Sequence, residues 1–284
     1  ALRRDLATPW RRLRPLPGLA LTALVSLPWY GLELLVEGQP FWDSFFGYHN
    51  LQRFTSVVND HLQPWWFFGP VMLVAAMPFS PLLVLGLARL PRQRTSPEQS
   101  LHQFAGCWLL AVFLLFTTAA TKLPSYWLPA TPAAAVLISV TLGRRDRWLG
   151  VAWASTLMIV LLLAVGFWCA PLWVPLITDP EMPTLAADLL ASGLVWRAAG
   201  WFSLAAVLGL VAWRCTAVVR LLAMQLPLLC FHLASLIPIA ELADQLRQLP
   251  LRQATQTLIN QQRPEEPLAM VGAMKPSVLS LIHI

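Results

Sequence analysis

Long runs of apolar residues, separated by short polar segments, dominate the pattern of this chain. Several runs approach or exceed the roughly 20 residues that an α-helix needs to cross about 30 Å of hydrocarbon. We expect a membrane-spanning helix in each of seven runs: residues 16–36, 65–88, 104–120, 127–143, 148–174, 194–213 and 221–240. The pattern therefore predicts an all-α polytopic membrane protein.

Composition supports this prediction and excludes a soluble class. Of 284 residues, 57% are hydrophobic and only 12% are charged, whereas soluble domains are about 25% charged. The net charge of +6 does not indicate nucleic-acid binding, because the basic residues lie in short clusters between apolar runs. The four cysteines lie in or beside apolar segments without CxxC spacing, so we predict neither a disulfide framework nor a metal site.

The distribution of positive charge predicts the orientation in the membrane. If the runs alternate across the bilayer, one side receives most of the arginines: Arg3, Arg4, Arg11, Arg12, Arg14, Arg89, Arg92, Arg94, Arg144, Arg145, Arg147, Arg214 and Arg220. Positive charge accumulates on the cytoplasmic side. The N-terminal end is therefore expected in the cytoplasm. Residues 37–64 and everything after about residue 241 are then expected to face outward.

The outward segment 37–64 is too rich in aromatic residues for a solvated loop. Its aromatic residues suit a helix that lies in the membrane interface with its apolar face in lipid: Phe41, Trp42, Phe45, Phe46 and Tyr48. On such a helix His49 and Arg53 share a face, and an arginine there can hold a lipid phosphate through two hydrogen bonds. An aromatic belt with a snorkelling arginine is the simpler interpretation, and it stays open.

A second segment, residues 121–129, places a lysine where positive charge is disfavoured. Lys122 is the only lysine before Lys275, and it ends an apolar run on the predicted outward side. Cations near the membrane interior are costly and often functional. Pro124 lies between Lys122 and Tyr126 and interrupts the helix, which frees backbone groups to form a polar pocket. Lys122 could merely snorkel, but we favour a functional role because it departs from the charge bias.

After residue 240 the composition changes. Leucines alternate with arginine and glutamine up to residue 258, which predicts one or two amphipathic helices outside the membrane. Residues 267–277 have the pattern of a strand and a turn, with a disordered tail as the alternative. We therefore divide the chain into a transmembrane region, 1–240, and the start of a periplasmic α/β domain, 241–284. The chain opens without Met, and residues 279–284 resemble a sequencing-adapter artefact, so we expect the gene to extend further at both ends.

Four motifs resemble bacterial members of the dolichyl-phosphate-mannose–protein mannosyltransferase superfamily, and in particular the 4-amino-4-deoxy-L-arabinose transferase type that modifies lipid A. The motifs are HNLQRF (49–54), HLQPWWFF (61–68) leading into PFS (78–80), KLPSYWLP (122–129), and LAMVG (268–272) followed by KPS (275–277). The resemblance implies the later half of a GT-C bundle with its active site at the outer membrane face. It also implies a donor that carries one sugar on a polyprenyl phosphate, and inverting transfer to an acceptor hydroxyl.

The same resemblance assigns site residues. A leaving lipid phosphate gains charge, so cations and hydroxyl donors should surround it. By resemblance, Arg53, Lys122 and Tyr126 bind this phosphate, and His49 and His61 help to shape the same pocket. The family's catalytic acid belongs to an earlier outward loop. We therefore assign no catalytic residue here and expect this part of the protein to be inactive by itself.

Two further questions stay open at this stage. Aminoarabinose transferases carry a Glu-His pair where this chain has His49 and Asn50, so the sequence supports no metal site and leaves the cofactor unknown. A polytopic transporter or lipid flippase is the alternative function, since interrupted helices and a membrane-depth cation would suit it too. The expected partners are membrane lipid and the polyprenyl-phosphate sugar donor. The expected location is the bacterial inner membrane with an outward active face, and the acceptor and the oligomeric state are undetermined.

Overall fold

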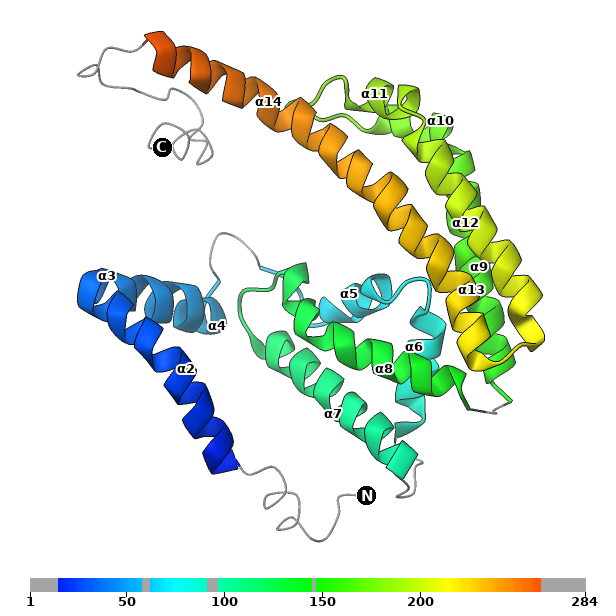
Figure 1. The fold of residues 1–284 in the computed structure, drawn as a ribbon, viewed down its shortest axis with the longest axis horizontal. Coiled ribbons are helices and arrows are strands. Elements are labelled where there is room, and N and C mark those ends of the chain that lie inside the picture. Colours follow the sequence, from blue (N-terminus) through cyan, green and yellow to red (C-terminus); the bar gives the residue numbers. More distant parts are fainter. Residues whose placement is uncertain (1–14, 58–61, 91–96, 145–146, 262–284) are drawn as a thin grey trace. The chain divides into compact units, whose positions relative to one another are not determined.

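The computed structural model describes residues 15–57, 62–90, 97–144 and 147–261. Within these ranges the regular structure is helical, and the sole strand-like feature is an isolated antiparallel bridge between Leu62 and Thr121. The chain forms two compact units, one up to Thr156 and one from Leu157, with the boundary inside helix α9. Figure 1 shows the helices and their labels.

The first unit carries the segments that the motifs single out. Its elements are α2 (Pro15–Val36), α3 (Gln39–Phe41), the π-helix η1 (Trp42–Gln52), α4 (Arg53–Thr55), α5 (Phe68–Ala75), α6 (Ser80–Ala88), α7 (Pro97–Thr118), the 3-10 helix η3 (Pro124–Ala130), α8 (Thr131–Leu142) and the first part of α9 (Leu149–Trp168). The second unit holds the rest of α9, α10 (Ala170–Trp173), η4 (Val174–Leu176), α11 (Leu185–Ala191), α12 (Leu194–Val211), η5 (Ala212–Arg214), α13 (Ala217–Phe231), η6 (His232–Leu236) and α14 (Ile237–Gln261).

Six helical stretches in the described residues are long and apolar enough to cross a membrane. They are Pro15–Val36, Ser100–Thr118, Pro124–Leu142, Leu149–Trp168, Leu194–Arg214 and Ala217–Gln261. These correspond to six of the seven predicted spans. The chain is thus an all-helical, multi-pass membrane protein in the part that the structure describes.

The predicted span over residues 65–88 differs from expectation, because it is not one helix. It is divided into α5 and α6, with a non-helical turn between Ala75 and Ser80. Pro78 and Pro81 lack the backbone N–H that a continuous helix would need. The Ser80 hydroxyl donates to the Leu73 carbonyl at 2.6 Å, which satisfies a carbonyl near the end of α5. Apolar composition predicted the run, and the two prolines explain its interruption.

The last predicted span also differs, because it continues beyond residue 240. Helices α13 and α14 form one stretch from Ala217 to Gln261, with the π-helical segment η6 inside it. The polar residues after 240 therefore extend the same helix, and one helix covers the region for which one or two were predicted. The predicted strand, turn and adapter-like residues lie at 262–284, outside the described residues. The division into domains at residue 240 stays a prediction.

The core of the first unit forms where α8 packs against both α6 and α7, as Figure 1 shows. Fully buried leucines from the three helices meet there: Leu82, Leu83, Leu109 and Leu137. Gly86 allows the closest approach, because a Cβ on it would lie 2.6 Å from Thr141 Oγ1. In contrast, α2 buries none of its residues against the rest of the described chain.

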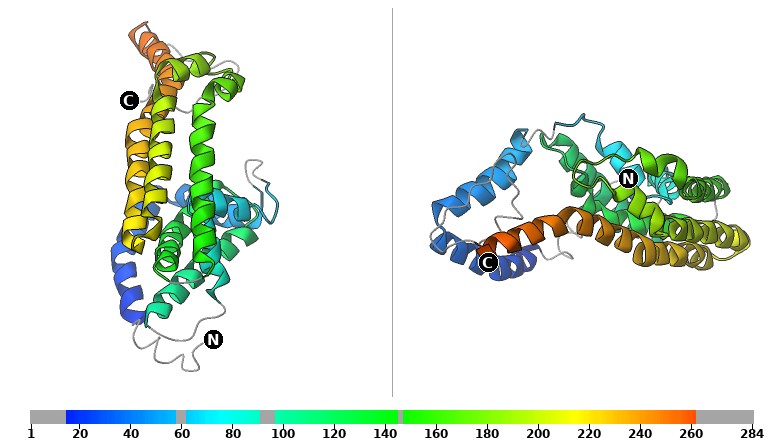
Figure 2. Two further views of the ribbon diagram at one scale, coloured as in Figure 1. Left: turned by 90° about the vertical axis from the view of Figure 1, so that its right-hand side faces the viewer. Right: turned by 90° about the horizontal axis from the view of Figure 1, so that it is seen from above.

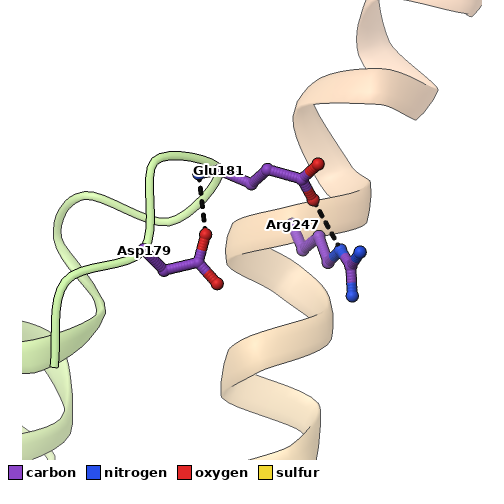
Figure 3. A network of polar contacts seen from close by, with 3 residues as sticks. All are labelled: Asp179, Glu181 and Arg247. Atoms are coloured by element: carbon purple, nitrogen blue, oxygen red, sulfur yellow. Dashed lines mark hydrogen bonds and ion pairs between the residues drawn. The ribbon is translucent and has the colours of Figure 1, made fainter. Parts of the chain in front are cut away.

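The second unit is organised around α12 and α13, which run side by side in both views of Figure 2. Phe202 links the helices, because its ring lies 5.3 Å from that of Phe167 and 4.8 Å from that of Phe231. Figure 3 shows a polar contact between α14 and the loop before α11. Arg247 Nε donates to Glu181 Oε2 at 2.9 Å. Both side chains are about half exposed, so the ion pair contributes little to stability.

Candidate functional site

A nearly continuous helix over residues 39–55 carries the first group of predicted site residues. It consists of α3, η1 and α4, and it follows α2 directly after Gly38, whose φ is 65°. Aromatic rings hold it against the end of α2: Tyr30 lies 5.6 Å from Phe45, and Trp29 lies 6.0 Å from Phe41. The helix predicted for this segment is confirmed, with π-type turns in its middle. His49 and Arg53 lie in its last turns.

The second group lies in the interruption between α7 and η3. Helix α7 ends at Thr118, and Pro124 begins the 3-10 helix η3, so residues 119–123 lie between the two helices. Backbone groups of these residues pair with the end of the 39–55 helix. Ala120 N donates to Phe54 O at 2.9 Å, and Thr121 N donates to Arg53 O at 3.1 Å. The two segments that the motifs predicted as functional are therefore hydrogen-bonded to each other.

Side chains reinforce this pairing. The buried Thr121 hydroxyl donates to the Ser56 carbonyl at 2.9 Å, and Thr121 also forms the bridge with Leu62. Lys122 is only 8% exposed, and its Nζ donates to Ala119 O at 2.7 Å. That bond satisfies a carbonyl freed at the end of α7. An ammonium group has three donors, and this bond uses one of them.

A pocket of about 240 Å³ opens where the two segments meet. Its lining is His49, Asn50, Arg53, Phe54, Phe116, Ala119 and Tyr126. Arg53 Nε is buried, and the described residues offer it no hydrogen-bond partner. A buried charged donor without a partner is destabilising by more than the roughly 1–3 kcal/mol of a neutral one. No carboxylate lines the pocket among the described residues, so the arrangement favours an anionic ligand.

Tyr126 is positioned by the 3-10 turn and by an aromatic neighbour. Its backbone N–H donates to Leu123 O at 3.1 Å, and its ring lies 4.9 Å from that of Phe116. Sequence reasoning missed Phe116 and Ala119, which line the pocket from the end of α7. Both belong to an apolar run in which nothing distinguishes them from lipid-facing residues. The long-range pairing of residues 53–56 with 120–121 turns them toward the site.

The structure thus brings together most of the residues that the sequence singled out. His49, Arg53 and Tyr126 line one pocket, and Lys122 is hydrogen-bonded to a residue of its lining. Their roles in binding phosphate stay predictions. His61, the remaining predicted residue, lies outside the described residues.

The residues of the pocket do not fit a resident metal ion. His49 offers one imidazole, and the neighbouring Asn50 donates its amide Nδ2 to Phe45 O at 2.6 Å. Nowhere in the described part of the chain do three or more His, Cys, Asp or Glu side chains gather in a metal-binding group. We therefore derive no chemical step through a metal here.

The contacts also bear on the alternation of the helices across the membrane. The two segments predicted for one side, 37–64 and 119–126, are hydrogen-bonded to each other. A second group of contacts lies at the other end of the unit. There Gly86, near the end of α6, lies against Thr141 at the end of α8. Gly86 is also close to His102, near the start of α7. These contacts place the two groups at opposite ends of α7, and the orientation in the membrane stays a prediction.

Comparison with known proteins identifies relatives. No family model matches the chain. The chain is 34% identical over 140 residues to the undecaprenyl phosphate-alpha-4-amino-4-deoxy-L-arabinose arabinosyl transferase of Pseudomonas aeruginosa, a match that covers 49% of the chain and 25% of the relative. It is 33% identical over 121 residues to the transferase of the same name from Erwinia tasmaniensis, which covers 43% and 21%. A Pseudomonas fluorescens transferase is 30% identical over 180 residues, which covers 61% and 32%.

Solved structures show the same likeness in the fold. The crystal structure of ArnT from Cupriavidus metallidurans bound to undecaprenyl phosphate matches with a TM-score of 0.63 at 21% identity, over 99% of this chain and 49% of that one. Its apo structure gives a TM-score of 0.68 at 20% identity, over 99% and 48%. The matches span only about a fifth to a third of the length of the curated relatives, and about half of the ArnT structures. The resemblance predicted from the motifs is thereby confirmed: the chain is similar to aminoarabinose transferases in sequence over about half of its length, and to ArnT in fold.

Proposed function

We propose that the full-length protein is a membrane glycosyltransferase that moves one sugar from a polyprenyl-phosphate carrier to an acceptor hydroxyl at the outer face of the bacterial inner membrane. The names of the relatives and the undecaprenyl phosphate bound to one ArnT structure support this proposal. One observation carries it: the pocket presents a buried arginine Nε without a partner, and Lys122 is buried beside the same lining. This arrangement suits a phosphate group.

The chemistry requires stabilisation of the leaving group. The acceptor oxygen forms a bond to the anomeric carbon, while the bond from that carbon to the phosphate oxygen breaks and the phosphate keeps both electrons. The acceptor proton passes to a base. As negative charge develops on the phosphate, Arg53 and Lys122 provide charge-assisted hydrogen bonds, and the Tyr126 hydroxyl provides a further donor. These groups are hydrogen-bonded or packed in place before the reaction, so little reorganisation opposes it.

The base is expected elsewhere in the protein. The described lining of the pocket contains an imidazole, an amide, a guanidinium and a phenol, but no carboxylate. We propose that the acid of the family's earlier outward loop supplies this function in the full-length protein. The pocket residues therefore support a proposed role in departure of the phosphate, activation of the acceptor is assigned to residues outside the pocket, and assays need the complete chain.

The test compares charge-removing variants in the full-length protein. We expect Arg53→Met and Lys122→Met each to lower kcat/KM for transfer by about 10- to 150-fold, since hydrogen bonds to charged groups contribute about 1.5–3 kcal/mol. Arg53→Lys should recover part of the loss, because lysine keeps the charge without the planar fork. Arg252→Met serves as the matched control, since Arg252 is an exposed arginine on the same predicted side.

Folding and binding are measured alongside transfer. Each variant should insert and elute as a single species like the wild type, and undecaprenyl phosphate should bind more weakly to Arg53→Met and Lys122→Met. Wild-type transfer by both variants would refute the proposed roles. Movement of a polyprenyl lipid across vesicles without any sugar transfer would instead support the flippase alternative. Undecaprenyl phosphate carrying 4-amino-4-deoxy-L-arabinose is the first donor to test, because the relatives are named for it.

A further inference from the structure

A second cavity lies in the first unit, apart from the candidate site. It is a groove of about 420 Å³ between α6 and the first turns of α9. Its lining recurs at helical spacing on both helices: Pro81, Val84, Leu85 and Ala88 on α6, and Trp148, Val151, Ala152 and Ser155 at the start of α9. Nearly all of these side chains are apolar. Helix α9 is long and apolar enough to cross a membrane, and the groove runs along its first turns, so a lipid chain is a suitable occupant.

The groove ends beside a group of arginines. The guanidinium of Arg147 lies over the ring of Trp148, 5.3 Å from its centroid, and Trp148 lines the groove. Arg89 follows directly after Ala88, the last groove residue of α6. Arg89 and Arg144 both lie within electrostatic range of the buried His102 ring, which places the ends of α6 and α8 together. An apolar groove thus leads to a strongly cationic end.

We propose that this groove holds an acyl chain of an anionic phospholipid, whose headgroup phosphate lies against Arg147 at the end of the groove. Basic pockets between membrane helices on the cytoplasmic side recognise such headgroups. The positive-inside pattern assigns this end to the cytoplasmic leaflet. The phospholipid stabilises the packing of α6 against α9 and anchors this end of the unit at the membrane surface.

The cationic end lies far from the candidate site. Along α7, His102 marks the arginine end and Phe116 lines the pocket with Arg53. At a rise of 1.5 Å per residue, these positions are about 20 Å apart. A carrier whose phosphate occupies the Arg53 pocket therefore cannot place that phosphate near Arg147. The inference concerns a different lipid and does not depend on the proposed sugar transfer.

The experiment measures lipid binding to the full-length protein purified in neutral detergent. Native mass spectrometry and thermal unfolding are recorded with added phosphatidylglycerol or phosphatidylcholine of the same acyl chains. We expect phosphatidylglycerol to bind more tightly and to raise Tm more. Arg147→Gln should weaken phosphatidylglycerol binding about fivefold and leave phosphatidylcholine unchanged, because one cation near a membrane surface contributes about a fivefold effect on affinity.

Two matched controls separate the groove from general effects. Ala88→Leu places extra apolar volume in the groove and should weaken both lipids, whereas Ala111→Leu makes the same change at an exposed position of α7 outside the groove. Arg214→Gln removes another arginine on the predicted cytoplasmic side and should leave binding unchanged. The proposal is overturned by equal binding of both lipids to the wild type, by an equal loss in Arg214→Gln and Arg147→Gln, or by full binding in Ala88→Leu. Competition by undecaprenyl phosphate for the same site would assign the groove to the carrier and also overturn it.

Discussion

The close contact between α6 and α8 makes a sharp prediction about Gly86. A Cβ at this position would lie 2.6 Å from Thr141 Oγ1, 3.5 Å from the Leu137 carbonyl oxygen and 3.8 Å from His102 Nε2. The last two distances are ordinary contacts, so Thr141 alone opposes an alanine. Thr141 is fully buried and β-branched, and rotation about its χ1 would bring its methyl group toward the same place. Only the remaining rotamer, which points the Cβ hydrogen at Gly86, relieves the clash, and its hydroxyl and methyl group would have to fit elsewhere in a fully buried site.

The magnitude follows from two opposing effects. Overpacking a tight core destabilises by about 1–3 kcal/mol, and replacing a helical glycine by alanine stabilises by about 1 kcal/mol. Gly86→Ala should therefore be neutral to destabilising by about 2 kcal/mol in the wild type. In a Thr141→Ala background the clashing atom is gone, so Gly86→Ala should become stabilising by up to about 1 kcal/mol. The coupling between the two positions is then about 1–3 kcal/mol.

Thermal unfolding of the full-length protein in detergent gives the measurement for all four members of the cycle. In domains of 150–250 residues, 1 kcal/mol corresponds to roughly 2–4 °C in Tm. A third background tests the geometry: Thr141→Val keeps a branched side chain at the same place, so Gly86→Ala should remain unfavourable there. The reasoning fails if Gly86→Ala shifts Tm equally in the Thr141→Ala, Thr141→Val and wild-type backgrounds.

Two other substitutions address the pairing of the site segments and the polar contact of the second unit. Thr121→Val removes the hydroxyl that donates to Ser56 O. The loss of one hydrogen bond of about 0.5–1.5 kcal/mol should weaken undecaprenyl-phosphate binding about two- to tenfold. Thr121→Ser keeps the donor and should bind like the wild type, and equal binding by both variants would exclude this role for the pairing. Glu181→Gln removes the ion pair with the half-exposed Arg247, and it should change stability by less than about 1 kcal/mol. A larger loss in chemical unfolding would contradict this weak contribution.

Much of the fold could be predicted from the apolar runs, because a membrane demands helices long enough to cross it. Six of the predicted spans correspond to helical stretches of this kind in the described residues. Where prediction failed, local chemistry overrode composition. Pro78 and Pro81 split an apolar run that looks continuous on a hydropathy scale. The helix from Ala217 runs past residue 240 and through Pro250, because polarity alone does not mark a helix end.

The site was predictable only in part. Arg53, Lys122 and Tyr126 stand out because a charge or a proline interrupts an apolar pattern. Such interruptions can be recognised from the amino-acid sequence alone. Phe116 and Ala119 are not visible in this way, since they lie in an apolar run and reach the pocket through hydrogen bonds between segments some 65 residues apart. The pairing between these two segments determines which face of α7 lines the pocket. The local sequence of α7 does not determine it.

The break between α7 and η3 explains how Arg53 and Lys122 are held near each other. Ending α7 at Thr118 frees the N–H groups of Ala120 and Thr121, and a membrane protein must satisfy them internally. They bind the carbonyls of Phe54 and Arg53, which fixes the Arg53 backbone against the segment that carries Lys122. A freed carbonyl of the same turn then accepts from Lys122 Nζ. These backbone hydrogen bonds therefore fix the Arg53 backbone relative to the Lys122 segment in the absence of a ligand.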